Sequence, residues 1–153
     1  MIDRTLAFAR VDWAPSHRQP SVLRVAVATV IAIVASLAAD AILVAAGTHL
    51  FPGTAGYDHF RFSDYAKLTI IGVLIGAAGW PVITRISSAP IRLYAWLTFL
   101  ITLALFLPDV WLLVRGQPPD AVAVLMVMHV AIAAVIYGSM VLVAPVRRVS
   151  RGG

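Results

Sequence analysis

Four long apolar stretches alternate with short polar segments along this 153-residue chain. A helix needs about 20 predominantly apolar residues to cross a hydrocarbon core of about 30 Å, and each stretch reaches that length. The pattern therefore predicts an all-α integral membrane protein with spans at about 22–46, 65–86, 91–114 and 121–143. It also divides the chain into an N-terminal cytoplasmic segment (1–20), a four-helix transmembrane domain (21–146) and a basic cytoplasmic tail (147–153).

Residues typical of helix ends support these boundaries. Ser21 is placed to cap the first span, and Gly47 to end it. Ser63 or Asp64 is placed to cap the second span, which contains Pro81. The later connections are short and rich in Pro and Gly, so neighbouring spans should run antiparallel. The simplest arrangement is an up-down four-helix bundle.

Basic residues predict the orientation. Positive residues beside membrane spans stay in the cytoplasm. Nine of the 12 basic residues lie near one set of span ends: Arg4, Arg10, Arg18, Arg24, Arg85, Arg92, Arg147, Arg148 and Arg151. The opposite ends carry only Arg61, Lys67 and Arg115. We therefore expect both termini in the cytoplasm.

The N-terminal segment has two interpretations. Ile2, Leu6, Ala9 and Trp13 fall on one helical face, which would suit a helix lying in the inner leaflet interface. A frayed basic tail explains the same residues.

Composition agrees with a membrane protein and excludes several classes. Hydrophobic residues make up 61% of the chain and charged residues 12%. The net charge of +5 is not arranged as a basic run interleaved with aromatics, so we expect no nucleic-acid partner. There are 0 cysteines, which excludes disulfides and thiolate-bound metals. The bias toward Arg, Asp, Ala and Val suggests a GC-rich bacterial genome, and we therefore expect a bacterial cytoplasmic membrane.

Small residues predict where the helices pack. In lipid, close approach of small side chains and a few hydrogen bonds hold helices together. The predicted packing positions are Ala28, Ala32 and Ser36 in the first span, Gly72 and Gly76 in the second, and Ala134 and Gly138 in the fourth.

Four polar residues should lie at a similar depth in the membrane. Asp40, Lys67, Asp109 and His129 come from four different spans, and all fall toward the non-cytoplasmic side. Ionisable groups at this depth are costly and are functional candidates. They could form a polar cavity that binds a ligand or protons, with Lys67 or protonated His129 balancing the acids. The alternative, which needs no ligand, is that they form interhelical hydrogen bonds that only hold the bundle together.

The long loop between the first two spans carries His49, Asp58, His59 and Asp64. Their spacing matches no standard zinc pattern, so we expect no metal site, with His49, Asp58 and His59 as weak candidates. An aromatic-rich cover over the bundle explains the loop better. No phosphate loop, catalytic elbow or paired-histidine haem motif occurs, and we expect no cofactor.

Short motifs in the last three spans carry a family resemblance: Asp64, Trp80-Pro81, Pro108-Asp109 and Met128-His129, with a glycine-rich run from Gly72 to Trp80. With these motifs the chain resembles a family of small four-span membrane proteins of unknown function found mainly in actinobacteria. The resemblance implies a four-helix inner-membrane protein with His129 as a shared feature, and it implies no activity.

These observations favour a non-enzymatic accessory or assembly subunit that contacts the lipid bilayer and binds other membrane proteins or its own copies. The first alternative is an oligomeric proton-coupled carrier or small-solute translocator that uses the four polar residues. The second is a lipid- or quinone-directed membrane enzyme with His129 as its base.

Overall fold

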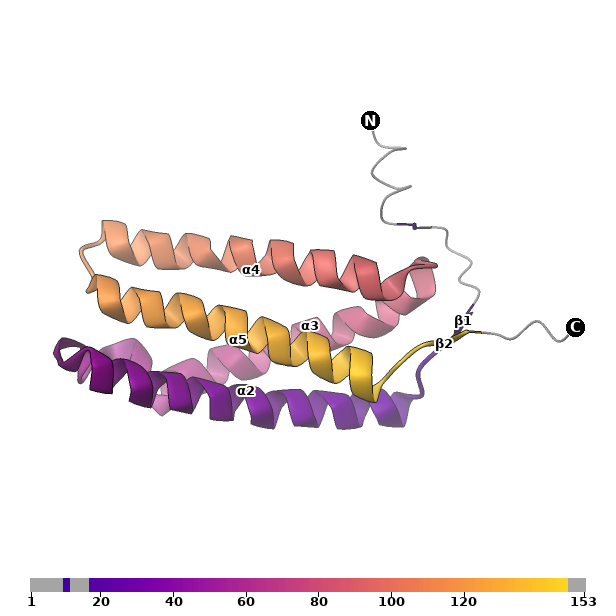
Figure 1. Cartoon of the computed structure of the whole chain (residues 1–153), viewed down its shortest axis with the longest axis horizontal. Helices are drawn as coiled ribbons and strands as arrows, with labels where there is room; N and C mark the ends of the chain where they lie inside the picture. Colours follow the sequence, from indigo (N-terminus) through magenta and orange to yellow (C-terminus); the bar gives the residue numbers. More distant parts are fainter. Residues whose placement is uncertain (1–9, 12–16, 149–153) are drawn as a thin grey trace, which may run out of the picture.

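The computed structural model describes residues 10, 11 and 17–148, and four long helices dominate them (Figure 1). The helices are α2 (Val22–Leu50), α3 (Phe62–Ile86), α4 (Pro90–Val114) and α5 (Pro119–Val143). Each is long and apolar enough to cross a membrane. The prediction of an all-α protein with four such helices is therefore confirmed.

The helices run antiparallel to their sequence neighbours and pack unequally. The most extensive contact joins α2 to α5, the first and last helices. On its other side, α5 packs against α4, and α3 crosses behind α2 and α5 (Figure 1). The α4 helix therefore stands at the edge of the bundle, supported mainly by α5.

Two predicted helix ends were wrong. The α2 helix continues through Gly47 to Leu50. Gly47 does not end the helix, because its lack of a side chain instead allows α5 to pack closely against α2. A Cβ placed on Gly47 would come within 2.7 Å of Val124 in α5. The α3 helix begins at Phe62, since Arg61 adopts the extended conformation before it and accepts backbone hydrogen bonds from Asp64 and Tyr65. Asp64 thus lies in the first turn and does not cap the helix.

Ser21 caps α2 as predicted, since its side chain accepts a hydrogen bond from the backbone N–H of Arg24. Proline is tolerated at Pro90 and Pro119 because the first-turn N–H groups have no intrahelical acceptor. The α3 and α4 helices run through Pro81 and Pro108 without ending.

The structure places the predicted small residues differently. Ala28, Ala32 and Ser36 are fully buried along one face of α2. In α3, a Cβ on Gly76 would come 3.1 Å from Ile136 of α5, whereas one on Gly72 would meet nothing within 4 Å. Gly138 also faces open space, and Ala134 is exposed. Within the chain, therefore, Gly76 supports a helix contact and Gly72 does not.

The bundle has two different ends. At the loop end, α2 and α3 are joined by residues 51–61, which contain the 3₁₀ turns η1 (Pro52–Thr54) and η2 (Asp58–Phe60), and α4 turns into α5. At the terminal end, the strands β1 (His17–Arg18) and β2 (Arg147–Arg148) pair antiparallel. The side chains of His17 and Gln19 also bond to the carbonyl oxygen of Thr84. The predicted interfacial helix falls on residues 1–20, mostly outside the described part of the chain.

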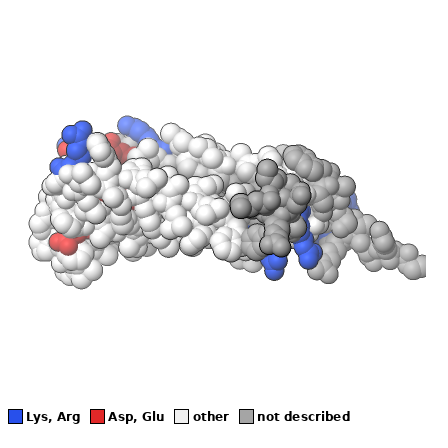
Figure 2. Space-filling model, turned by 90° about the horizontal axis from the view of Figure 1, so that it is seen from above, with Lys and Arg blue, Asp and Glu red and all other residues white. Residues whose placement is uncertain are grey.

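Charged side chains gather toward the two ends, and the middle of the visible face is uncharged (Figure 2). This distribution matches four apolar helices with polar ends. At the terminal end the described charged side chains are all arginines: Arg10, Arg18, Arg24, Arg85, Arg92 and Arg147. The loop end carries both signs, including Arg61, Lys67, Arg115, Asp58, Asp64 and Asp120.

Candidate functional site

A polar cluster occupies the half of the bundle nearer the loop end. We define it as Ser36, Asp40, Tyr57, Thr69, Asp109 and His129. At a rise of about 1.5 Å per residue, Asp40 and His129 lie about 15 Å from the loop-end termini of their helices, Thr69 about 11 Å and Asp109 about 8 Å. All four long helices contribute at least one member.

Asp40 is fully buried and is held by α3. The hydroxyl of Thr69 donates a 2.6 Å hydrogen bond to Oδ2 of Asp40. Asp40 follows Ala28, Ala32 and Ser36 on the buried face of α2, where small residues let α3 and α5 come close. No lysine or arginine pairs with Asp40 in the described part of the chain.

Asp109 and His129 form the second contact of the cluster. Oδ2 of Asp109 lies 3.0 Å from Nδ1 of His129, which joins α4 to α5. The Asp109 side chain is 4% exposed and that of His129 is 28% exposed, so the histidine is the accessible partner. The Asp109 carboxylate beside Nδ1 orients the imidazole of His129. The other ring nitrogen, Nε2, is then available to bind a ligand or to exchange a proton.

The two contacts belong to one electrostatic unit. Asp40 interacts electrostatically with His129, and Asp109 with His59 of the loop. Tyr57, between the two 3₁₀ turns, packs edge-on against His59 and Phe60 at 5.2 Å between ring centroids. Burial raises the pKa of the Tyr57 phenol, and the negative charges of Asp109 and Asp58 raise it further. Tyr57 therefore stays protonated and can donate a hydrogen bond at the mouth of the cluster.

Several buried polar atoms of the cluster lack a hydrogen-bond partner in the protein. They are the hydroxyl oxygens of Ser36 and Tyr57, Oδ1 of Asp40, Oδ2 of Asp109 and Nδ1 of His129, the last two of which meet only each other. The described part of the chain has no other buried side-chain atom of this kind. Unsatisfied buried polar atoms are rare and indicate a place for water, an ion or a ligand. Their concentration here identifies the polar cluster as the candidate site.

Packed apolar side chains close the bundle below the cluster. Trp80 is fully buried, lies 5.1 Å from Tyr94 between ring centroids, and donates a 2.9 Å hydrogen bond to the carbonyl of Ala144. Met140 and Val73 are also fully buried in this layer, and the hydroxyl of Tyr94 donates to the carbonyl of Gly76. The polar cluster thus extends from the loop end to Ser36 in the middle of α2.

The structure brings together three of the four predicted site residues. Lys67 is exposed on α3, and no ion pair joins it to Asp40 or Asp109 in the described part of the chain. The reason is helical spacing, since Thr69 and Tyr65 take the buried face of α3. His129 is therefore the cluster's basic partner among the predicted residues.

The loop between α2 and α3 covers the loop end of the bundle, and its histidines and acids do not form a cluster. Phe60 and Thr54 are buried, whereas His49 and His59 are exposed. Asp58 lies 3.8 Å from Arg61 on the surface. No group of three or more metal-binding side chains occurs within the described residues.

Sequence reasoning missed Thr69 and Tyr57. Thr69 follows Tyr65 by one helical turn, and both lie on the buried face of α3, so helical spacing could have identified it. Tyr57 had no such signal, because it reaches the cluster through the fold of an irregular loop.

A model of a family of unknown function, DUF6069, matches residues 16–145, which include all four helices and every member of the cluster. No curated protein and no solved structure matches the chain.

Proposed function

We propose a function for this chain from its site, because it belongs to the DUF6069 family, whose function is unknown. The proposed function is that of an oligomeric proton-coupled carrier or translocator, in which the polar cluster takes up protons from one side of a membrane. The observation that carries this proposal is the gathering of unpartnered buried polar atoms around Asp40, Asp109 and His129. Unsatisfied buried polar atoms are rare in packed proteins, and a proton carrier needs such atoms to bind water and exchange protons.

The geometry supports a one-sided path. Tyr57 and His59 belong to the loop, Asp109 and Thr69 lie about 8–11 Å inside the helix ends, and Asp40 and His129 lie about 15 Å inside. Ser36, one turn beyond Asp40 on α2, is the deepest member of the cluster. Histidine titrates near neutral pH and suits proton exchange with water. The apolar layer around Trp80 closes the other half, so transport requires a rearrangement or a second copy of the chain to complete the path.

The proposal also includes an orientation of the protein in the membrane. The described arginines at the terminal end favour a cytoplasmic terminal end, with the loop end outside a bacterial cytoplasmic membrane. The cluster would then open to the outer side. Four spans throughout the family, and its mainly actinobacterial distribution, stay predictions.

Proton flux into proteoliposomes tests the proposal. With a membrane potential imposed, we expect the wild-type protein to acidify the lumen and Asp109→Asn to abolish this flux, because the amide cannot exchange a proton with His129. Asp120→Asn is the matched control, since Asp120 is an exposed acid at the same end of the bundle. Absence of flux in the wild type would exclude proton translocation by the chain alone, and equal flux in Asp109→Asn would exclude Asp109 from the proton path.

The accessory role is a second proposal, favoured by the position of α4. This helix packs mainly on α5, and its opposite face carries exposed Leu100, Leu107 and Trp111. Such a face could pack against a helix of another membrane protein or of a second copy. Purification in mild detergent should then recover one partner in fixed stoichiometry, and recovery of the chain alone as a monomer would argue against this role.

A further inference from the structure

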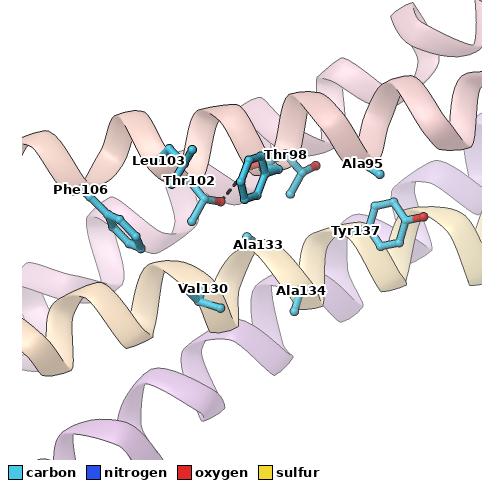
Figure 3. A pocket seen from close by; sticks show the side chains of 10 residues that line it. Ala95, Thr98, Thr102, Leu103, Phe106, Val130, Ala133, Ala134 and Tyr137 are labelled. Atoms are coloured by element: carbon cyan, nitrogen blue, oxygen red, sulfur yellow. Dashed lines mark hydrogen bonds between the residues drawn. The ribbon is translucent and has the colours of Figure 1, made fainter. Parts of the chain in front are cut away.

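An apolar groove of about 380 Å³ runs between α4 and α5 (Figure 3). Its α4 wall includes Ala95, Thr98 and Phe106, and its α5 wall includes Val130, Ala133 and Tyr137. From Ala95 to Phe106 the groove follows α4 for about 16 Å at about 1.5 Å per residue. Its volume lies within the range of small-molecule pockets.

Three of the side chains that line the groove carry a hydroxyl, Thr98, Thr102 and Tyr137, and that of Thr102 is bonded within the chain. Thr102 donates to the carbonyl of Thr98 on its own helix at 2.8 Å (Figure 3). The walls are otherwise aromatic rings, methyl groups and branched aliphatic side chains. A flexible apolar chain fits these walls, and a polar one does not.

The loop-end limit of the groove is polar. Phe106 lines the groove and also packs against His129, with 6.4 Å between ring centroids. Val130, the residue after His129, lines the groove as well. The partly exposed imidazole therefore stands where the apolar walls end, with Asp109 behind its Nδ1.

We infer that this groove binds a membrane quinone, with the tail between α4 and α5 and the headgroup hydrogen-bonded to Nε2 of His129. The inference is independent of proton transport, because it concerns a ligand bound beside α4 and α5 and requires no path across the bundle. It concerns binding of the quinone and includes no reaction of it.

Charge and depth favour a quinone over a phospholipid. The groups nearest the headgroup position are the carboxylate of Asp109 and the imidazole, and no arginine or lysine pairs with either in the described part of the chain. An anionic phosphate would be repelled by Asp109. His129 also lies about 15 Å from the start of α5, inside a hydrocarbon core of about 30 Å, where a neutral headgroup is tolerated and a charged one is not. A quinone carbonyl accepts a hydrogen bond there, and the corresponding quinol hydroxyl donates one.

Photo-crosslinking in lipid nanodiscs tests this inference. The probe is a benzoquinone whose decyl tail carries a diazirine, and the labelled residues are located by mass spectrometry. We expect labelling concentrated on the groove-lining segments of α4 and α5, and competition by the same quinone without the diazirine. Dioleoylglycerol, which is neutral but has no quinone ring, should not compete.

Two variants separate binding from folding. Ala133→Leu fills the groove, whereas Ala123→Leu adds the same side chain at an exposed position of α5 outside it. His129→Gln removes the imidazole, and the loss of one hydrogen bond should weaken competition by about tenfold.

Labelling lost in Ala133→Leu and kept in Ala123→Leu supports the site. Labelling spread evenly over the lipid-facing helices, or displaced equally by dioleoylglycerol, overturns it. Either result leaves the proton-flux experiment on Asp109→Asn to be judged separately.

Discussion

Asp40→Asn is expected to reduce proton flux through the reconstituted protein by about a hundredfold, within the range that a positioned proton-transfer group supplies. Asparagine matches the shape of aspartate but does not titrate. Its amide oxygen can accept the same hydrogen bond from Thr69, so the contact between α2 and α3 should survive. Flux in proteoliposomes and elution volume in detergent measure the two effects.

This variant distinguishes a functional cluster from one that only stabilises the bundle. Asp64→Asn serves as the control, because Asp64 lies in the first turn of α3 and contributes no atom to the cluster. A loss of assembly in Asp40→Asn would favour the purely structural explanation. Unchanged flux with normal assembly would exclude Asp40 from proton transfer.

Trp80→Ala should lower the free energy of unfolding by about 3–5 kcal/mol, the usual cost of deleting a large buried aromatic side chain. Trp80 is fully buried, packs on Tyr94 and donates a hydrogen bond to Ala144 just beyond α5. In lipid, lost packing contacts and an unpaired carbonyl account for the cost, since association of helices there does not depend on excluding water. Reversible unfolding in mixed micelles measures it.

Trp111→Ala is the matched control for this experiment. Trp111 is 57% exposed on α4, and the guanidinium of Arg115 lies 5.0 Å from its ring. An exposed cation–π contact is worth about 0.5–1 kcal/mol, so this variant should lose at most that much. Equal losses in the two variants would mean that the Trp80 layer does not hold the bundle together.

The architecture could be predicted because membrane spans depend on length and composition. Each helix contains an apolar run long enough to cross a bilayer, and the short connections leave the neighbouring helices antiparallel. Helix ends were harder to predict. Gly47 reads as a stop in sequence, but in the structure it allows Val124 of α5 to approach, which a local pattern cannot indicate.

The site could be predicted in part for a similar reason. Asp40, Asp109 and His129 stand out because charged groups are rare in apolar spans. Lys67 stands out equally, yet it faces outward, because depth alone does not determine the face of a helix. Thr69 and Tyr57 are ordinary residues that become part of the cluster only through packing between helices and through the path of the loop.

The extensive contact between α2 and α5 has a consequence for biosynthesis. Of the four long helices, α2 is synthesised first and α5 last. The most extensive helix contact therefore cannot form until synthesis of the fourth helix is complete. Until the final helix is inserted, Asp40 has Thr69 but lacks the imidazole on the other flank. If the helices span a membrane as proposed, a nascent chain halted after α4 would expose the carboxylates of Asp40 and Asp109 to lipid, a form suited to recognition by quality control.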